Sequence, residues 1–236
     1  YLGRGEFVAK RAITFVILVA IPLLLILIQP SLGVAVITFI GILGVLAASS
    51  IKKKYFIVGF LLLVLLFPML WTVLAPYKKQ RIMTFIDPYT DPQGSGYNSI
   101  QSMISVGSGR FFGRGLGEGV QTQLAFLPEK HTDFMFAAAA EELGFVGAIF
   151  LLLGLFIIIW RLIIIVEYPR SPTARAFATG LFFALFSETI IHVGMNMGLL
   201  PITGVPLPLV SAGGSAFLGT MVGLAIAVNA KKESST

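Results

Sequence analysis

The sequence predicts an all-α polytopic membrane protein of about six transmembrane helices with a large extracellular loop. The 236-residue chain is 56% hydrophobic and 12% charged, about half the charged fraction of an ordinary soluble domain. Its mean hydropathy is +0.91. The apolar residues also gather in runs of about 20, the length that crosses a bilayer as a helix.

The apolar runs define the predicted spans, which are listed at the end of this paragraph. The first two are short and are separated by Pro30 and Gly33, which favour a tight turn, so a helical hairpin is expected; one bent helix is the alternative. Pro68 is expected to kink the third span, because proline cannot donate to the helix hydrogen-bond ladder. The spans are Ala12–Ile28, Val34–Ala48, Tyr55–Leu74, Leu143–Val166, Ala176–Leu199 and Leu209–Ala230.

Charge distribution predicts the orientation. Six spans place both termini on one side, and most of the 17 lysines and arginines then lie on that side, which the positive-inside rule assigns to the cytoplasm. The segment 76–133 is therefore an expected extracellular loop, and the turn Gln29–Gly33 and the loop Pro201–Gly214 lie on the same outer side. The whole chain, 1–236, is interpreted as one membrane domain.

Composition also excludes some classes of protein. A net charge of +6 is compatible with nucleic-acid binding, but the basic residues stand at the ends of apolar runs, so no nucleic-acid partner is expected. The chain has no cysteine, which excludes disulfides and thiolate metal sites. Tyr1 is not an initiator methionine, so an N-terminal truncation is expected.

The outer loop is rich in turn signals and glycine. Residues 100–106 are expected to form a short helix or an interfacial segment. The segment Gly107–Gly119 then places glycine at nearly every second position, without the strand, helix and spacing of a nucleotide-binding loop. It is interpreted as a flexible loop or, alternatively, as backbone that approaches a phosphate closely, with Arg110 and Arg114 supplying positive charge.

The segment after this loop holds an aspartate at an expected helix start. Thr132 is expected to cap a helix that begins at Asp133. Asp133 either stabilises the helix N-terminus or acts as a general base. Nearby Lys130, Arg110 or Arg114 would lower its pKa and burial would raise it, and the sequence does not decide between them.

Two acids follow on the same predicted helix. Glu141 lies about 12 Å along that helix from Asp133 and about 80° around it, and Glu142 points roughly opposite Asp133. Both are interpreted as structural or cavity acids. A carboxylate buried at the membrane needs a partner, and a basic residue from another helix is expected to form an ion pair with it.

Other polar clusters are weaker indications. The alternation of Glu129, His131 and Asp133 is compatible with a metal site, but no metal site is predicted. Glu188 and His192 lie one turn apart and are too few for a structural metal site. They are expected to form a hydrogen bond between membrane helices. The segment His192–Phe217 breaks the apolar pattern with proline and glycine and is expected to pack beside the outer loop.

These motifs resemble the SEDS family (shape, elongation, division and sporulation proteins) over nearly the whole chain. The resemblance is strongest in Asp87–Gly119, Phe126–Gly147 and Gly194–Ser215. The GYN, QS and FLPE sequences that begin at residues 96, 101 and 126 are more similar to the RodA branch than to the division branch. The resemblance implies about ten membrane helices, of which these spans would be the last six.

The resemblance also implies an activity. It points to a peptidoglycan glycosyltransferase that polymerises lipid II at the outer face of the bacterial cytoplasmic membrane during elongation, with undecaprenyl pyrophosphate as leaving group. The aspartate of the family's H-T-D-F motif is catalytic and matches Asp133. The diphosphate would be held by Arg110, Arg114, Lys130 or a divalent cation such as Mg²⁺. The other candidates for substrate binding are Glu129, His131, Gln101 and Ser211.

The same resemblance implies partners, and the chain differs from the family's usual sequence at two positions. A class B penicillin-binding protein and other membrane proteins of the elongation complex are the implied partners. Ser31 occupies the position of a usual aspartate, and Ala212 that of a common tyrosine. Two alternatives stay open: a lipid II flippase, and a non-catalytic scaffold for the penicillin-binding protein, which Ser31 would suit because its neutral hydroxyl is no base.

Overall fold

The computed structural model describes residues 9–28, 31–49 and 75–231 with the single positions 61, 65 and 72, and for 9–16 and 27 it describes the backbone alone. This part of the chain is helical and has no strand, only an isolated bridge between Pro169 and Lys231. Its elements are α1 (Ala9–Ile28), α2 (Leu32–Ala47), α4 (Pro76–Ile86), η1 (Pro88–Thr90), α5 (Tyr97–Ser108), α6 (Val120–Gln123), α7 (Met135–Glu167), α8 (Pro172–Asn196) and α9 (Gly214–Asn229).

Among the described helices, two match membrane spans by length and composition. These are α7, with 33 residues, and α8, with 25. Helices α1, α2 and α9 coincide with predicted spans, but α2 and α9 have 16 residues each. The predicted span Tyr55–Leu74 and the kink at Pro68 lie outside the described residues, apart from three positions. The number of six spans therefore stays a prediction.

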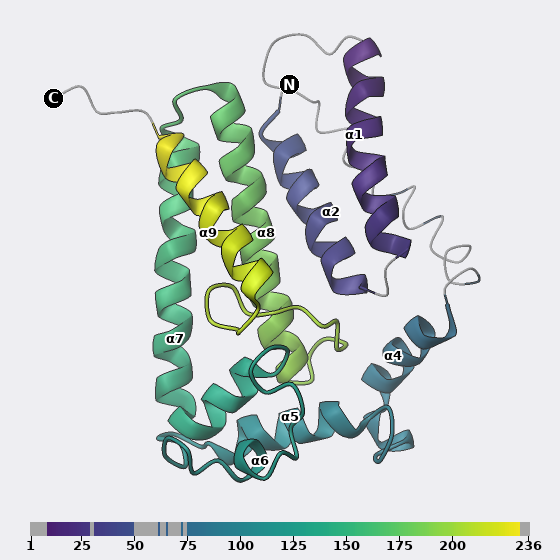
Figure 1. Cartoon of the computed structure of the whole chain (residues 1–236), viewed down its shortest axis with the longest axis vertical. Helices are drawn as coiled ribbons and strands as arrows, with labels where there is room; N and C mark the ends of the chain where they lie inside the picture. Colours follow the sequence, from purple (N-terminus) through teal and green to yellow (C-terminus); the bar gives the residue numbers. More distant parts are fainter. Residues whose placement is uncertain are drawn as a thin grey trace, which may run out of the picture.

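The spans form a bundle around α8 (Figure 1). On one side α8 approaches α2 closely, because Gly41 and Gly180 face each other: a Cβ at Gly180 would lie 3.2 Å from the carbonyl oxygen of Gly41. On the other side α7 and α9 pack against α8 through the buried residues Ile159, Leu162, Ile165, Ala178, Leu185 and Ala227. Helices α1 and α2 lie side by side as two separate helices, which confirms the hairpin and not the single bent helix.

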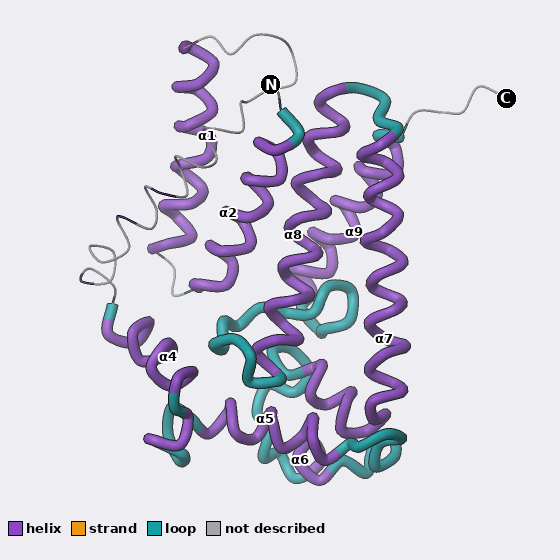
Figure 2. Tube along the Cα trace, turned by 180° about the vertical axis from the view of Figure 1, so that it is seen from behind, coloured by secondary structure: helices purple, strands orange, loops and turns teal. Residues whose placement is uncertain are grey.

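The segment 76–134 is more ordered than a loop. It forms α4, η1, α5 and α6, which gather at one end of the bundle (Figure 2). The short helix expected at residues 100–106 is confirmed as part of α5. The connection between α8 and α9 lies at the same end (Figure 1). Which side of the membrane this end faces stays a prediction.

Helix α7 is broken at Gly144, which has φ 71° and ψ −170°. The part before the break bends away from the long part (Figure 1). Backbone of the glycine-rich segment satisfies both broken ends: Arg114 N–H donates to Glu141 O (2.9 Å), and Arg110 O accepts from Phe145 N–H (2.8 Å). The free backbone groups that any helix end leaves are thereby paired.

These backbone hydrogen bonds between the glycine-rich segment and the break in α7 are called the splice below. They explain why two positions of that segment are glycine. A Cβ at Gly113, which has φ +80°, would overlap the carbonyl of Glu142, and one at Gly109 would overlap the carbonyl of Ala140. Only glycine allows this approach and this φ without strain. The close backbone approach expected toward a phosphate is therefore made, at these two positions, toward α7.

Candidate functional site

The start of α7 is capped by α8 and not by Thr132. Helix α7 begins at Met135, and its N-cap Phe134 provides no side-chain cap. The backbone N–H of Phe136 donates to His192 Nε2 (3.3 Å), and that of Ala137 donates to Asn196 Oδ1 (3.2 Å). The predicted cap at Thr132 is wrong because its hydroxyl donates instead to Glu129 Oε2 (2.9 Å).

His192 and Asn196 are fully buried on one face of α8. His192 Nδ1 lies 2.7 Å from the carbonyl oxygen of Val205. A carbonyl only accepts and a backbone N–H only donates, so the neutral Nδ1–H tautomer satisfies both contacts of the ring. The predicted hydrogen bond between membrane helices is confirmed for His192, while Glu188 has no such bond in the described part of the chain.

Asn196 connects three elements. Its Nδ2 donates to the carbonyl of Asp133 (3.1 Å), and its Oδ1 accepts from Ala137 N–H and from Ser102 Oγ (3.4 Å). The carbonyl of Asn196 also accepts from Ser102 Oγ (2.9 Å). Sequence reasoning missed this residue, although an amide four positions after His192 in an apolar run is a signal of such a network.

Replacing Asn196 by leucine is expected to destabilise the protein by about 3 kcal/mol, because it leaves buried donors and acceptors of three elements unpaired. The thermal unfolding midpoint in detergent measures this. Asn229→Leu is the control, because Asn229 is exposed on α9 and makes no side-chain hydrogen bond with any described residue. Equal midpoints for the two variants would contradict the role of Asn196.

The connection between α8 and α9 binds the segment just before α7 from the side opposite Asn196. Ser211 Oγ donates to the carbonyl of Thr132 (2.7 Å), and Ala212 N–H donates to that of His131 (2.8 Å). A Cβ at Gly204 would lie 3.5 Å from Asp133 Oδ2. The expected packing of this connection beside the segment 76–133 is confirmed, and the backbone of Asp133 is held from both sides.

The carboxylate of Asp133 is half-buried. Burial raises its pKa above the ordinary value, the Glu129 carboxylate raises the pKa further, and the Arg81 guanidinium lowers it. The sequence left the net direction open and predicted Lys130, Arg110 or Arg114 as the cation. The cation that acts on Asp133 is instead Arg81 of α4, far away in the chain, and only the folded arrangement of α4 brings it near.

Arg81 lines a cavity at this end of the described structure. This cavity has a volume of about 360 Å³. Its polar lining is mostly neutral donors and acceptors, which suit an anion beside one guanidinium. The lining residues are Tyr77, Gln80, Arg81, Thr84, Ser95, Ser99 and Ile202.

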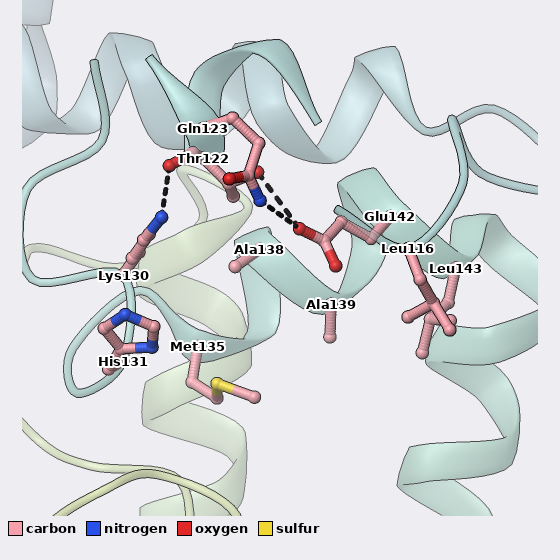
Figure 3. A pocket seen from close by; sticks show the side chains of 10 residues that line it. All are labelled: Leu116, Thr122, Gln123, Lys130, His131, Met135, Ala138, Ala139, Glu142 and Leu143. Atoms are coloured by element: carbon pink, nitrogen blue, oxygen red, sulfur yellow. Dashed lines mark hydrogen bonds between the residues drawn. The ribbon is translucent and has the colours of Figure 1, made fainter. Parts of the chain in front are cut away.

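Another cavity, of about 250 Å³, lies between α6 and the first part of α7 (Figure 3). It brings together Lys130, His131 and Glu142. Lys130 Nζ donates to the carbonyl of Thr122, and Glu142 Oε1 accepts from Thr122 Oγ1 (3.3 Å) and from Gln123 Nε2 (3.2 Å). The apolar lining comes from Leu116, Met135, Ala138, Ala139 and Leu143.

The ion pair expected for the buried acids is wrong. The fully buried Glu141 accepts from the backbone N–H groups of Gln121 (2.9 Å) and Thr122 (3.0 Å), at the start of α6. These donors satisfy the carboxylate, so no basic side chain is needed. The carboxylate of Glu142 likewise accepts hydrogen bonds from the Thr122 hydroxyl and the Gln123 side-chain amide.

The other predicted site residues are dispersed. Arg110 and Arg114 are exposed at the break in α7, at the opposite end of its first part from Asp133. Gln101 lies half-buried on α5. Among the described residues, no group of three His, Cys, Asp or Glu could hold a metal ion.

Ser31, which stands where the family usually has an aspartate, is the N-cap residue of α2, and its side chain makes no cap hydrogen bond. Nearby Gly33 packs against the connection between α8 and α9, since a Cβ there would lie 2.9 Å from the carbonyl oxygen of Thr203. That connection also passes near Asp133 at Gly204. Ser31 is therefore close in the fold to the candidate site, although no described contact joins it to Asp133.

Comparisons with known sequences match nearly the whole chain. Residues 5–236 match the model of the FtsW, RodA and SpoVE family, described as cell cycle proteins. Over 214 residues the chain is 42% identical to the peptidoglycan glycosyltransferase MrdB of Escherichia coli, covering 90% of this chain and 58% of the relative. Over 238 residues it is 34% identical to FtsW of Thiomicrospira cyclica, covering 96% and 60%.

Two solved structures are also similar. One shows the structural coordination of polymerization and crosslinking by a peptidoglycan synthase complex; the matching chain has a TM-score of 0.72 and 31% identity, over 90% of this chain and 59% of that one. The other is a mutant of the rod shape-determining protein RodA of Thermus thermophilus, with a TM-score of 0.61 and 23% identity, over 98% and 61%. The chain thus spans about three fifths of its relatives.

Proposed function

Because the chain belongs to the FtsW/RodA/SpoVE family of cell cycle proteins, we propose that the protein is a peptidoglycan glycosyltransferase. It polymerises lipid II into glycan strands at the outer face of the bacterial cytoplasmic membrane during elongation. The single observation that carries this role is Asp133, a half-buried carboxylate of raised pKa whose backbone is held from two sides. A base needs such fixed geometry and a pKa near the working pH.

The reaction uses Asp133 as the base. The acceptor sugar hydroxyl attacks the anomeric carbon of the donor, and its proton passes to the Asp133 carboxylate. The new glycosidic C–O bond forms as the bond from the anomeric carbon to the diphosphate oxygen breaks, and undecaprenyl pyrophosphate leaves with the electron pair. Carboxylate and diphosphate therefore need separate surroundings, one accepting a proton and one stabilising negative charge.

Positive charge for the diphosphate comes first from Arg81. It acts on Asp133 and lines a cavity of about 360 Å³, and a guanidinium fork suits phosphate oxygens. Lys130 is a second candidate from the neighbouring cavity. A divalent cation such as Mg²⁺ bound to the diphosphate is the alternative source of charge. Glu129, His131, Gln101 and Ser211 remain proposed contacts of the sugar and peptide parts.

The proposal includes orientation and partners. Both termini face the cytoplasm, and the end of the bundle with α4, α5 and α6 faces outward, as the positive-inside rule favours. A class B penicillin-binding protein is the proposed partner, supported by the likeness to a chain from a complex that couples polymerization and crosslinking. Other elongation-complex membrane proteins are further partners.

The experiment that tests this function uses the full-length protein in vesicles with labelled lipid II. Glycan strands resolved on a gel, with release of undecaprenyl pyrophosphate, are expected from the protein alone. Movement of lipid II across the vesicle membrane without longer products would favour the flippase. Binding of the penicillin-binding protein with no synthesis would favour the scaffold.

The acid limb of the pH–rate profile is expected to shift when a charged neighbour of Asp133 is removed. A base must be ionised, so the rate falls as the pH drops through its pKa. Glu129→Gln removes a charge that raises this pKa and moves the limb to lower pH; Arg81→Met removes a charge that lowers it and moves the limb to higher pH. Polymerisation measured as kcat/KM against pH reports the free enzyme.

The control for this profile is Glu118→Gln, because Glu118 is exposed in the glycine-rich segment and is not among the groups that act on Asp133. Its profile is expected to match the unchanged protein. Opposite shifts for Glu129→Gln and Arg81→Met separate an electrostatic effect from a general loss of activity. A limb that moves in neither variant would reject Asp133 as the titrating base.

A further inference from the structure

The glycine-rich segment presents large apolar side chains to its surroundings. Phe111 is 68% exposed, Phe112 84% and Leu116 77%. Scattered apolar residues on a surface are ordinary, but a concentration of this kind marks an interaction site. These three residues are called the loop patch below.

The loop patch continues the apolar outside of α7. The rings of Phe111 and Phe145 meet edge to face at 6.0 Å, and Phe111 O accepts from Val146 N–H (3.1 Å). From Phe145 onward, α7 carries exposed apolar side chains along its length: Phe150, Leu153, Phe156 and Trp160. Helix α7 is the longest described helix that matches a membrane span. The surface beside the loop patch is therefore one that a bilayer covers.

The charges beside the loop patch also suit the surface of a bilayer. Arg110 precedes the loop patch, and Arg114 lies between Phe112 and Leu116. Both arginines are exposed and pair with no carboxylate among the described residues. The backbone between them is fixed by the splice to α7, so the aromatic rings keep their outward direction. Apolar side chains beside arginines at the end of a span are typical of the bilayer interface, where the cations meet lipid phosphates.

We propose that the loop patch inserts into the bilayer interface and that Arg110 and Arg114 bind the phosphates of anionic lipid headgroups. The two arginines then anchor the segment that splices α7, and they do not hold the substrate diphosphate near Asp133. This inference concerns a lipid surface and does not depend on the proposed glycosyltransferase activity.

Site-directed spin labels test the insertion, and the absence of cysteine makes single labels simple to introduce. The full-length protein is labelled at Phe112→Cys, at Leu116→Cys or at the control Tyr89→Cys, and is placed in vesicles of phosphatidylethanolamine and phosphatidylglycerol. Tyr89 is also 68% exposed but lies on η1, away from α7. Labels at 112 and 116 are expected to collide more with oxygen than with a water-soluble nickel chelate, and the label at 89 the reverse.

Two other results would overturn the insertion. Labels at 112 and 116 as open to the nickel chelate as the control would mean that water surrounds the loop patch. Labels protected from both reagents would mean that protein covers it, either further helices, a second copy or a partner.

Lipid composition tests the arginines. Replacing phosphatidylglycerol by phosphatidylcholine is expected to reduce the oxygen preference of the label at 112 at least about twofold, since the net negative headgroups that attract the arginines are replaced by zwitterionic ones, whose phosphate is neutralised by choline. In the double variant Arg110→Gln/Arg114→Gln the label is expected to respond equally to both lipids. An unchanged dependence on phosphatidylglycerol in the double variant would reject the headgroup contacts.

Discussion

Replacing Asp133 by alanine is expected to reduce polymerisation of lipid II by the full-length protein by about 10²–10⁴-fold, the usual contribution of a general base. The reason is local: its half-buried carboxylate interacts with the charges of Glu129 and Arg81, and a Cβ at Gly204 would lie 3.5 Å from its Oδ2. Initial rates from a gel-based assay with labelled lipid II measure the loss. Asp133→Asn is expected to lose as much, because an amide of the same shape takes no proton.

The fold is expected to survive these changes. Asn196 binds the carbonyl of Asp133 and not its carboxylate, so the network with α8 remains. An unchanged thermal midpoint for Asp133→Asn separates a loss of catalysis from a loss of structure. Glu118→Gln is the control, because it removes an acid elsewhere in the segment 76–134. Full polymerisation by Asp133→Ala would refute its role as base.

Replacing Gly113 by alanine is expected to destabilise the protein by about 2–5 kcal/mol. A positive φ costs about 1–2 kcal/mol for a residue with a Cβ, and overlap with the carbonyl of Glu142 adds about 1–3 kcal/mol. Loss of the splice would also move the first part of α7, so polymerisation is expected to fall with stability. The thermal unfolding midpoint in detergent measures the first effect.

The chain offers two matched controls for this substitution. Gly117 has φ +76° but no atom within 4 Å of an added Cβ, so Gly117→Ala isolates the cost of the backbone angle. Gly154 lies within α7 with equally open surroundings and no positive φ, so Gly154→Ala is expected to be neutral or stabilising. A Gly113→Ala midpoint no lower than that of Gly117→Ala would disprove the splice.

The sequence predicted what depends on local pattern. Long apolar runs predicted α7 and α8, and the H-T-D-F motif directed attention to Asp133 before any contact was known. The same reasoning predicted that the connection after α8 packs beside the loop 76–133, since irregular backbone among spans must find partners; the structure shows these contacts at residues 131–132.

What the sequence could not predict are the partners that folding brings together. Thr132 has a cap-forming side chain, yet His192 and Asn196 of a distant helix reach the free N–H groups first. Glu141 was expected to meet a cation, but the backbone of α6 satisfies it. Backbone donors carry no signature in a sequence, so both predictions overlooked them.

The break at Gly144 has a consequence for the vertical position of Asp133 in the membrane. A straight helix of 33 residues would be about 50 Å long, about 20 Å more than the hydrocarbon thickness of a bilayer. Its first turns would rise into water and carry Asp133 with them. The bend turns this surplus length sideways, so that in the proposed orientation the Asp133 carboxylate stays level with the membrane boundary, where the lipid-linked substrate of the proposed reaction would present its diphosphate.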